Sequence, residues 1–476
     1  MSNSTLARQR ILALLDENSF VEIGALVTAR ATDFNLKQTK APSDGVITGY
    51  GVIDGNPVYV YSQDASVLGG SIGEMHGKKI VKLYDLAMKT GAPVIGLIDS
   101  AGLRLQEATD ALNAFGEVYL KQTLASGVIP QITAVFGSCG GGLALIPALT
   151  DFTFMEKTKA KLFVNAPNTL NGNEISRCDT SSAEFQSEKT GLVDVADEEA
   201  QLYAQIRELV GMLPCNNEED GAYDVCSDDL NRLCPDLAGC AADAVLALSR
   251  IADDFRFFET KRSYAEEMVT GFLKLNGVTV GAVANRTCKY DEQGEKACEF
   301  DPVLTVRGCY KAAEFVNFCD AFGIPVLTLT NVKGFRADIC SERNIARAAA
   351  KMVYAFANAT VPKVNVITGS AYGSGYVVMN SRSIGADMTF AWPEAQIGTM
   401  DARLAARIIC DGQGAEAIET CAKEYAKLQN NAESAAGRGY IDTIIAPEET
   451  RKYVIGAFEM LFTKKEERPV KKHGTV

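Results

Sequence analysis

The sequence predicts an α/β fold that occurs twice along the chain, and three observations lead to this prediction. Short apolar runs alternate with helical patterns, as in proteins that layer helices on a sheet. The chain has 476 residues, which is more than one ordinary hydrophobic core accommodates. Segments of the first half also match segments of the second half at a constant separation. We therefore expect two domains of one architecture.

The repeat is clearest in two segments. Residues 91–102 correspond to residues 323–334, and residues 128–142 correspond to residues 360–374. Position 91 is as far from position 323 as position 128 is from position 360, and we call this constant separation the repeat offset. Solenoid repeats recur at roughly 20–50 residues, so a duplicated domain is the better interpretation.

The composition changes between the two copies. Residues 214–240 are rich in Asn, Asp, Glu and Gly, which is typical of a connecting segment. We expect an N-terminal domain at residues 1–213, a linker at 214–240 and a C-terminal domain at 241–476.

Each half contains apolar runs that end in glycine turns and lead into helices. The predicted buried strands are Val94–Ile98, Ile132–Phe136, Val326–Leu329 and Val364–Ile367. Helical patterns follow at Ala108–Ser126 and Ser341–Ala357. A strand, a turn, a helix and a second strand form a right-handed βαβ unit. These units predict a layered α/β fold in each half.

Four glycine turns follow predicted strands at their carboxyl ends, where ligands bind in α/β sheets. They are Ala101–Leu103, Gly140–Gly142, Gly334–Phe335 and Gly373–Gly375. Each turn opens a helix, so its N–H groups are free, and two converging N–H groups can hold an oxyanion. Such glycines can also serve only to make a tight turn. The spacing from Gly102 to Gly141 equals that from Gly334 to Gly373, which favours a functional role for all four turns.

Several other kinds of site are disfavoured. The chain has only two histidines, His76 and His473, so a Ser-His-Asp triad or a histidine metal site is hard to build. The spacing of Cys215, Cys226, Cys234 and Cys240 fits no paired zinc motif, and we expect no metal. Cys139 lacks an evident base and is interpreted as a small buried thiol. The absence of an obvious base favours electrostatic stabilisation of an enolate.

Charge, cysteine content and hydropathy favour a cytoplasmic protein that does not bind nucleic acid. The net charge of −13 opposes phosphate binding. Thirteen cysteines, an odd number, indicate reduced thiols, and the N-terminus resembles no signal peptide. Residues 122–150 carry no charge, but Pro130 and Pro147 interrupt them, so a membrane span is disfavoured.

Several motifs now identify a family resemblance. They include Gly45–Gly51, Gly69–His76, Leu124–Gln131, Ala359–Lys363 and Lys471–Gly474. The chain resembles the biotin-dependent acyl-CoA carboxyltransferases over nearly its whole length. This family contains propionyl-CoA carboxylase β subunits, methylmalonyl-CoA transcarboxylases and the α subunits of sodium-pumping acyl-CoA decarboxylases.

The resemblance implies two tandem crotonase-like (ClpP/crotonase) domains, a homo-hexamer, and transfer of CO2 between carboxybiotin and an acyl-CoA. The first domain would bind acyl-CoA, and the second would bind biotin on a separate carrier protein or domain. A biotin carboxylase or a membrane decarboxylase subunit would be a further partner. The implied thioester oxyanion hole consists of Gly102, Leu103, Gly141 and Gly142. The implied biotin oxyanion hole consists of Gly334, Phe335, Ser374 and Gly375.

The sequence departs from the family pattern at several turn positions. Lys333 stands where the family has a proline before Gly-Phe, and Val377 stands where relatives have a substrate-tuning aspartate. The acyl group is therefore left open, although propionyl-CoA and methylmalonyl-CoA fit the family. The alternatives are a decarboxylase α subunit, which runs the same chemistry backwards, and a catalytically weakened scaffold paralogue.

Overall fold

The computed structural model describes residues 5–30, 41–219, 225–291, 293–469 and 474–475, so His473 lies outside the described residues. The chain divides into two compact units, residues 1–222 and 223–476. The division falls inside the segment predicted as a linker. Each unit is an α/β structure built on one eight-stranded sheet.

The sheet of the first unit has the strand order β1-β2-β3-β4-β5-β6-β8, with β7 paired to β5. The pairs β1–β2 and β2–β3 are antiparallel, and all later pairs are parallel. The strands are β1 (Val21–Ile23), β2 (Val46–Ile53), β3 (Asn56–Gln63), β4 (Val94–Ser100), β5 (Gln131–Gly140), β6 (Phe152–Glu156), β7 (Lys161–Phe163) and β8 (Val195–Asp197).

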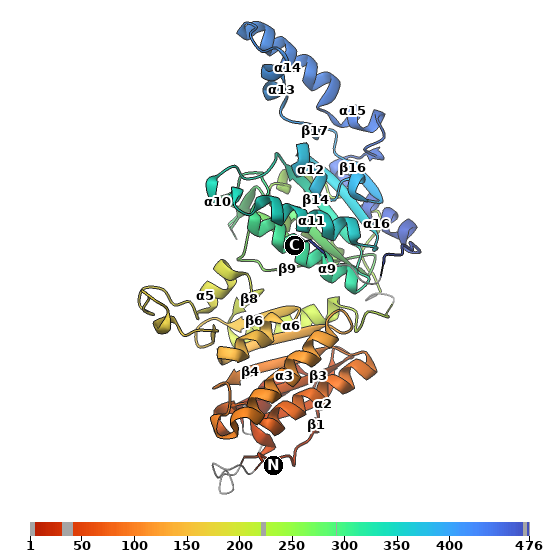
Figure 1. Ribbon diagram of the computed structural model, residues 1–476. Helices are drawn as coiled ribbons and strands as arrows, with labels where there is room; N and C mark the ends of the chain where they lie inside the picture. Colours follow the sequence, from red (N-terminus) through yellow and green to blue (C-terminus); the bar gives the residue numbers. More distant parts are fainter. Residues whose placement is uncertain (1–4, 31–40, 220–224, 292, 470–473, 476) are drawn as a thin grey trace. The chain divides into compact units, whose positions relative to one another are not determined.

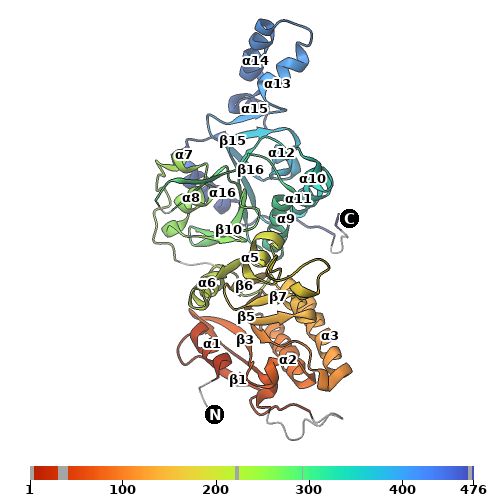
Figure 2. The ribbon, with the colours of Figure 1, turned by 90° about the vertical axis from the view of Figure 1, so that its left-hand side faces the viewer.

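Helices cover both faces of this sheet, as Figure 2 shows, with α2 and α3 on one side and α1 and α6 on the other. The helices are α1 (Leu6–Leu14), α2 (Glu74–Thr90), α3 (Ala108–Ala125), α4 (Leu145–Ala148), α5 (Ala183–Phe185) and α6 (Glu199–Met212). Apolar side chains of α2, α3, β4 and β5 form one buried cluster. The sheet is therefore buried on both faces, which explains its continuous apolar strands.

The sheet of the second unit has the order β9-β10-β11-β14-β15-β16-β18, with β17 paired to β15. Its strands are β9 (Phe257–Thr260), β10 (Met268–Leu275), β11 (Val278–Asn285), β14 (Val326–Val332), β15 (Lys363–Tyr372), β16 (Met388–Ala391), β17 (Gln396–Gly398) and β18 (Thr443–Ile444). A separate hairpin contains β12 (Cys288–Tyr290) and β13 (Lys296–Glu299). This connectivity reproduces that of the first sheet strand by strand.

The helices of the second unit lie on both faces of its sheet, and α13 and α14 extend away from it (Figure 1). They are α7 (Leu237–Cys240), α8 (Ala244–Ile251), α9 (Val306–Ala321), α10 (Ile339–Glu342), α11 (Ile345–Asn358), α12 (Gly373–Val378), α13 (Ala402–Ile409), α14 (Ala415–Gln429), α15 (Ala432–Gly437) and α16 (Thr450–Leu461). The predicted helix at Ser341–Ala357 is interrupted between α10 and α11.

The pairing register confirms that the two units are copies of one fold. Val94 pairs with Gln131 between β4 and β5, and Val326 pairs with Lys363 between β14 and β15. Val326 and Lys363 follow Val94 and Gln131 by the same repeat offset. Isolated parallel bridges also correspond, because Ile72 pairs with Leu103 and Leu304 pairs with Phe335.

The segment predicted as a linker is packed at both of its ends. The Nδ2 of Asn216 donates a hydrogen bond to the Gly91 carbonyl at 2.9 Å. In the second unit, Cys234 and Leu237 are buried in the hydrophobic core, with 2% and 1% of their surface exposed. The part that follows residue 224 therefore contributes to the folded second unit.

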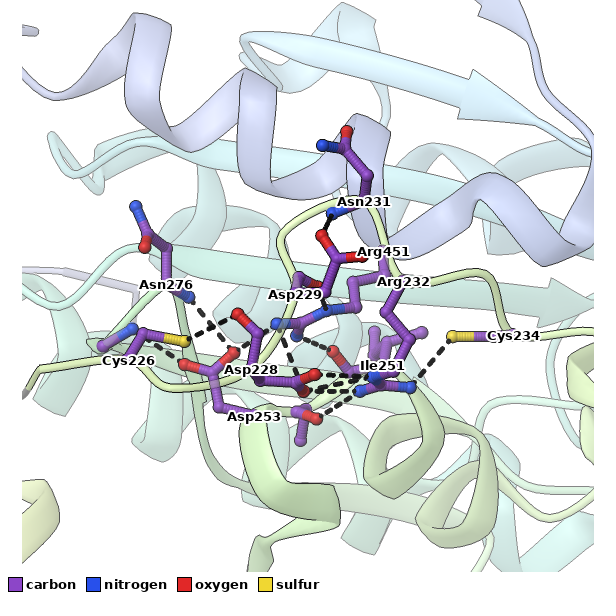
Figure 3. Close-up of polar contacts among 12 residues, drawn as sticks. Cys226, Asp228, Asp229, Asn231, Arg232, Cys234, Ile251, Asp253, Asn276 and Arg451 are labelled. Atoms are coloured by element: carbon purple, nitrogen blue, oxygen red, sulfur yellow. Dashed lines mark hydrogen bonds and ion pairs between the residues drawn. The ribbon is translucent and has the colours of Figure 1, made fainter.

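A buried arginine joins this segment to the second unit (Figure 3). The guanidinium of Arg451, on α16, is fully buried and donates to the Ile251 carbonyl at 2.6 Å and to Asp253 at 2.7 Å. Asp228 lies 3.4 Å from the same guanidinium. In the first unit Arg207 makes the matching contacts to Leu14 and Asp16, but its side chain is 26% exposed.

Replacing Arg451 with methionine should destabilise the second unit by about 3–5 kcal/mol, because Asp253 and Asp228 would lose a buried counterion. Urea unfolding can be followed through Trp392, the only tryptophan, whose Nε1 donates to Thr450 at 3.0 Å.

The matched control is Arg207→Met in the first unit, followed by circular dichroism, which should cost less because Arg207 is partly solvated. A loss below about 1 kcal/mol for Arg451→Met would show that this ion pair does not stabilise the second unit.

Candidate functional site

The two predicted turns of the first unit lie side by side. β4 ends at Ser100 and its parallel neighbour β5 ends at Gly140, so both turns leave the same edge of the sheet. A Cβ atom on Gly102 would lie 3.6 Å from the Gly140 carbonyl oxygen. Gly102 and Gly141 have φ angles of +94° and +64°, which favour glycine at both positions.

The backbone N–H groups of Leu103, Gly141 and Gly142 are the candidates for binding an oxyanion at these turns. The Gly102 carbonyl accepts a hydrogen bond from the Ile72 N–H, and the Arg104 N–H donates to the Ile72 carbonyl. Among the described residues, the Leu103 N–H between them has no hydrogen-bond partner. Gly141 and Gly142 begin a 3-10 helix, Gly141–Ala144, whose first N–H groups have no partner within the helix. The N–H of Gly102 is already used, because it donates to Ser100 Oγ at 3.1 Å. The turns can therefore present N–H groups to an oxyanion.

The second unit brings its two turns together in the same way. A Cβ atom on Gly375 would lie 2.9 Å from the Gly334 Cα. The Gly334 carbonyl accepts a hydrogen bond from Leu304, and the N–H of Arg336 donates to the Leu304 carbonyl, both at 2.9 Å. These contacts reproduce the pattern around Leu103, with Phe335 in its place.

The other predicted residues of this unit lie on α12. Ser374 is exposed and Gly375 is buried, and both belong to the first turn of the helix, where N–H groups lack partners within the helix. Val377 lies on the same helix and is half-buried. At the repeat offset, Ser374 matches Gly142 and Gly375 matches Leu143.

A buried charge cluster, which the sequence reasoning missed, holds the first turn. The guanidinium of Arg104 is 1% exposed and forms ion pairs with Asp44 and Glu107. It also donates to the Ser71 carbonyl at 2.6 Å. A Cβ atom on Gly73 would lie 2.5 Å from both Arg104 and Glu107, so glycine there leaves room for the cluster.

His76 is part of the same buried environment and has no free ring nitrogen. Its Nδ1 donates to the Asp44 carbonyl at 2.9 Å, and its Nε2 accepts from Gln63 at 3.2 Å. Burial, together with the charge of Arg104, holds the pKa of His76 well below its ordinary value of 6.5. Burial raises the pKa of Asp44, although the Arg104 guanidinium opposes this change. His76 is therefore a neutral structural residue rather than a catalytic base.

The second unit supports its turn differently. Arg336, which matches Arg104, is exposed and lies 3.8 Å from Asp301. The N–H of Lys333 donates to the Pro302 carbonyl at 2.7 Å. The two copies thus share a backbone arrangement but differ in the charges around it.

Tyr119 is a second residue that sequence reasoning did not identify. Its hydroxyl, on α3, donates to the Gly142 carbonyl at 2.6 Å. A Cβ atom on Gly142 would lie 3.0 Å from that hydroxyl. Tyr119 therefore fixes the orientation of the peptide group that follows Gly142.

Cys139, which lies just before the Gly140–Gly142 turn, does not suit a nucleophilic role. Cys139 is buried, and burial raises its pKa, which disfavours the thiolate. No cluster of three or more histidine, cysteine or acidic side chains suited to a metal ion occurs in the described ranges.

Within the ranges that the structure describes, no helix is long and apolar enough to cross a membrane.

The neutral state of His76 predicts a pH effect on stability. Its folded pKa lies below the ordinary 6.5, so the unfolded chain binds an extra proton as the pH falls through about 6.5. The contribution of His76 to the free energy of unfolding should therefore decrease as the pH falls from about 7 to about 5.5, whereas Asp151, whose pKa burial raises to about 7, contributes with the opposite sign. Urea unfolding followed by circular dichroism measures this slope.

The variant His76→Gln should lose that decrease, whereas the control His473→Gln should keep it. Equal pH slopes in the wild type and in His76→Gln would contradict the assignment of a buried neutral imidazole.

Comparison with known proteins adds independent evidence. The carboxyl transferase domain matches residues 2–476. The propionyl-CoA carboxylase beta chain of Roseobacter denitrificans is 41% identical, over 99% of this chain and 93% of the relative. The methylmalonyl-CoA decarboxylase subunit alpha of Veillonella parvula is 40% identical, over 99% of this chain and 92% of the relative.

A solved structure shows the same fold. Transcarboxylase 12S, a hexamer solved with hydrolysed methylmalonyl-CoA bound, superposes with a TM-score of 0.90 at 36% identity. The match covers 98% of this chain and 92% of that chain. The predicted crotonase-like fold and the predicted carboxyltransferase activity are confirmed. The chain belongs to the carboxyl transferase family of enzymes.

Proposed function

We propose that this protein transfers a carboxyl group between biotin on a separate carrier protein and a short acyl-CoA such as propionyl-CoA or methylmalonyl-CoA. The observation that carries the proposal is the pair of adjacent glycine turns in each unit. One reaction that passes through two enolates, one of the acyl thioester and one of biotin, needs two oxyanion holes.

The first unit is assigned to the acyl-CoA. Leu103, Gly141 and Gly142 would donate N–H groups to the thioester oxygen, and Gly102 would allow its close approach. The buried ion pairs of Arg104 would keep this turn in place without reorganisation during the reaction. The proposed domain limits remain 1–213 and 241–476, with Cys234 and Leu237 of the proposed linker packing into the core of the second unit.

The second unit is assigned to biotin, which supplies the transferable carboxyl group. Phe335, Ser374 and Gly375 would present N–H groups to the ureido oxygen beside Gly334. Val377, one turn further along α12, would tune the choice of substrate. No side chain needs to act as base in this scheme, which is consistent with the neutral, fully engaged His76.

The relatives are named as a beta chain and an alpha subunit, which supports the presence of further partner chains. We expect a biotin carrier protein and either a biotin carboxylase or a membrane decarboxylase subunit, with this chain as a homo-hexamer in the cytoplasm. The hexamer is supported by transcarboxylase 12S. The free state of all thirteen cysteines supports a reducing compartment.

Decarboxylation is a second candidate direction, favoured by the similarity to methylmalonyl-CoA decarboxylase alpha subunits. The same site would then load biotin from the acyl-CoA. Affinity purification of the tagged protein from its own cells distinguishes the two directions. Recovery of a biotin carboxylase favours synthesis, and recovery of an integral membrane subunit favours decarboxylation.

The direct test is carboxyl transfer by the purified protein, with free biotin as acceptor and malonyl-, methylmalonyl- or glutaconyl-CoA as donor. We expect decarboxylated acyl-CoA only when biotin is present. No biotin-dependent product from any donor, even with a biotinylated carrier protein, would overturn the proposal.

Two glycine substitutions should separate the two oxyanion holes. Gly142→Val would crowd the Tyr119 hydroxyl, and Gly375→Ala would push against the Gly334 backbone. Each should lower the rate of transfer by at least about 100-fold. Calorimetry should show that Gly375→Ala still binds the acyl-CoA normally.

Gly116→Ala and Gly437→Ala are matched controls, because a Cβ atom at either position meets no atom within 4 Å. They should keep wild-type rates. Full activity in Gly142→Val, with an intact assembly, would remove that turn from the reaction.

A further inference from the structure

A polar pocket of about 440 Å³ lies beside the Gly334 turn in the second unit. Its lining includes Thr287, Asn331, Lys333, Ser370, Glu394 and Gln396. Asn331 lies on β14, and Lys333 directly follows the last residue of that strand. Ser370 and Gln396 occupy paired positions on β15 and β17. The pocket is therefore at the carboxyl edge of the sheet, next to the proposed biotin oxyanion hole.

Lys333 contributes a cation and Glu394 contributes a carboxylate to the lining of this pocket. Its backbone is held by the hydrogen bond to Pro302, while its side chain is exposed. In the described ranges the Lys333 ammonium group has no carboxylate within 4.0 Å, and Glu394 of the same pocket has no ion pair either. An ammonium group placed this way can bind a carboxylate.

The first unit shows that this charge is particular to the second copy. At the repeat offset, Lys333 matches Ala101 and Asn331 matches Asp99. The Asp99 carboxylate is paired with Arg10 at 2.9 Å. The same edge of the sheet thus has an acid in the first unit and a neutral amide followed by a lysine in the second.

Hydrogen bonds hold Asn331, one of the residues that line this pocket, in place. The Asn331 Oδ1 accepts a hydrogen bond from the Ser370 N–H at 3.0 Å, and the Asn331 N–H donates to Asn285 at 3.0 Å. Gly369 leaves room for this amide, because a Cβ atom there would lie 2.7 Å from the Asn331 Oδ1. An anion entering the pocket would therefore meet the hydrogen-bonded Asn331 and Ser370 and the Lys333 cation, with the Glu394 carboxylate in the same lining.

We propose that Lys333 is a specificity-determining residue that binds the carboxylate of carboxylated biotin and so distinguishes it from unloaded biotin, whose ureido ring is neutral. This inference rests on the proposed function. It adds that Lys333 recognises the negative charge of the carboxylate. Lys333 would make the enzyme prefer the loaded carrier in the direction of acyl-CoA carboxylation. It would also hold the newly formed carboxylate in the opposite direction.

The test measures binding without turnover, using two matched probes. One is a biotin amide with a carboxymethyl group on the ureido nitrogen N1′, and the other is its neutral methyl ester. Calorimetry on the full-length protein should show that the wild type binds the acid at least about tenfold more tightly than the ester. Lys333→Met should abolish this preference, and Lys333→Arg should keep it.

The control Lys351→Met, at an exposed lysine of α11 in the same unit, should keep the preference. The double variant Lys333→Met/Glu394→Gln tests whether Lys333 merely neutralises Glu394. Our inference requires that the double variant also lacks the preference for the acid over the ester. A double variant that regains this preference would overturn the inference.

Kinetics provide a second measure. With biotin as the substrate, Lys333→Met should lower kcat and leave the KM for biotin unchanged, because only the product has the carboxylate. Equal binding of acid and ester by a wild type that transfers carboxyl groups would overturn the inference and leave the proposed function standing. Absence of wild-type transfer would instead count against the proposed function, while the probes would still decide the role of Lys333.

Discussion

The structure depends on the close approach of two backbone turns at the ends of adjacent parallel strands. In the second unit the Gly375 position lies so near the Gly334 backbone that a Cβ atom would come within 2.9 Å of it. In the first unit, positive φ angles at Gly102 and Gly141 impose a similar requirement. Glycine meets these constraints without strain, and adjacent parallel strands bring such turns together at one edge of the sheet. The same strand order, pairing register and glycine positions therefore occur together in both units.

The two copies differ in the charges that surround this shared backbone. The first turn is fixed by the buried cluster of Arg104, Asp44 and Glu107. The second turn has the exposed cations Lys333 and Arg336 instead. A neutral thioester oxygen that becomes an enolate suits the first environment, and a group that already has a carboxylate suits the second. Duplication thus supplies the geometry, and divergence of side chains supplies the selectivity.

Much of the fold could be predicted because it follows local patterns. Apolar runs such as Val94–Ile98 reflect strands buried on both faces, and the constant repeat offset reflects the duplicated register. The interruption at Arg343 and Asn344 was missed, because helical periodicity continues across it. The Arg104 cluster could not be predicted, since Asp44 is sixty positions away and is brought close only by the folded sheet. Tyr119 had no signal beyond its place in a helical pattern.

The most direct test of the central claim is an experimental structure of the protein with an acyl-CoA bound. Our account predicts that the thioester oxygen lies about 2.7–3.1 Å from backbone nitrogens contributed by both turns of the first unit, Leu103 from one and Gly141 or Gly142 from the other. A thioester oxygen that contacts neither turn, or that is held only by side chains, would contradict the account.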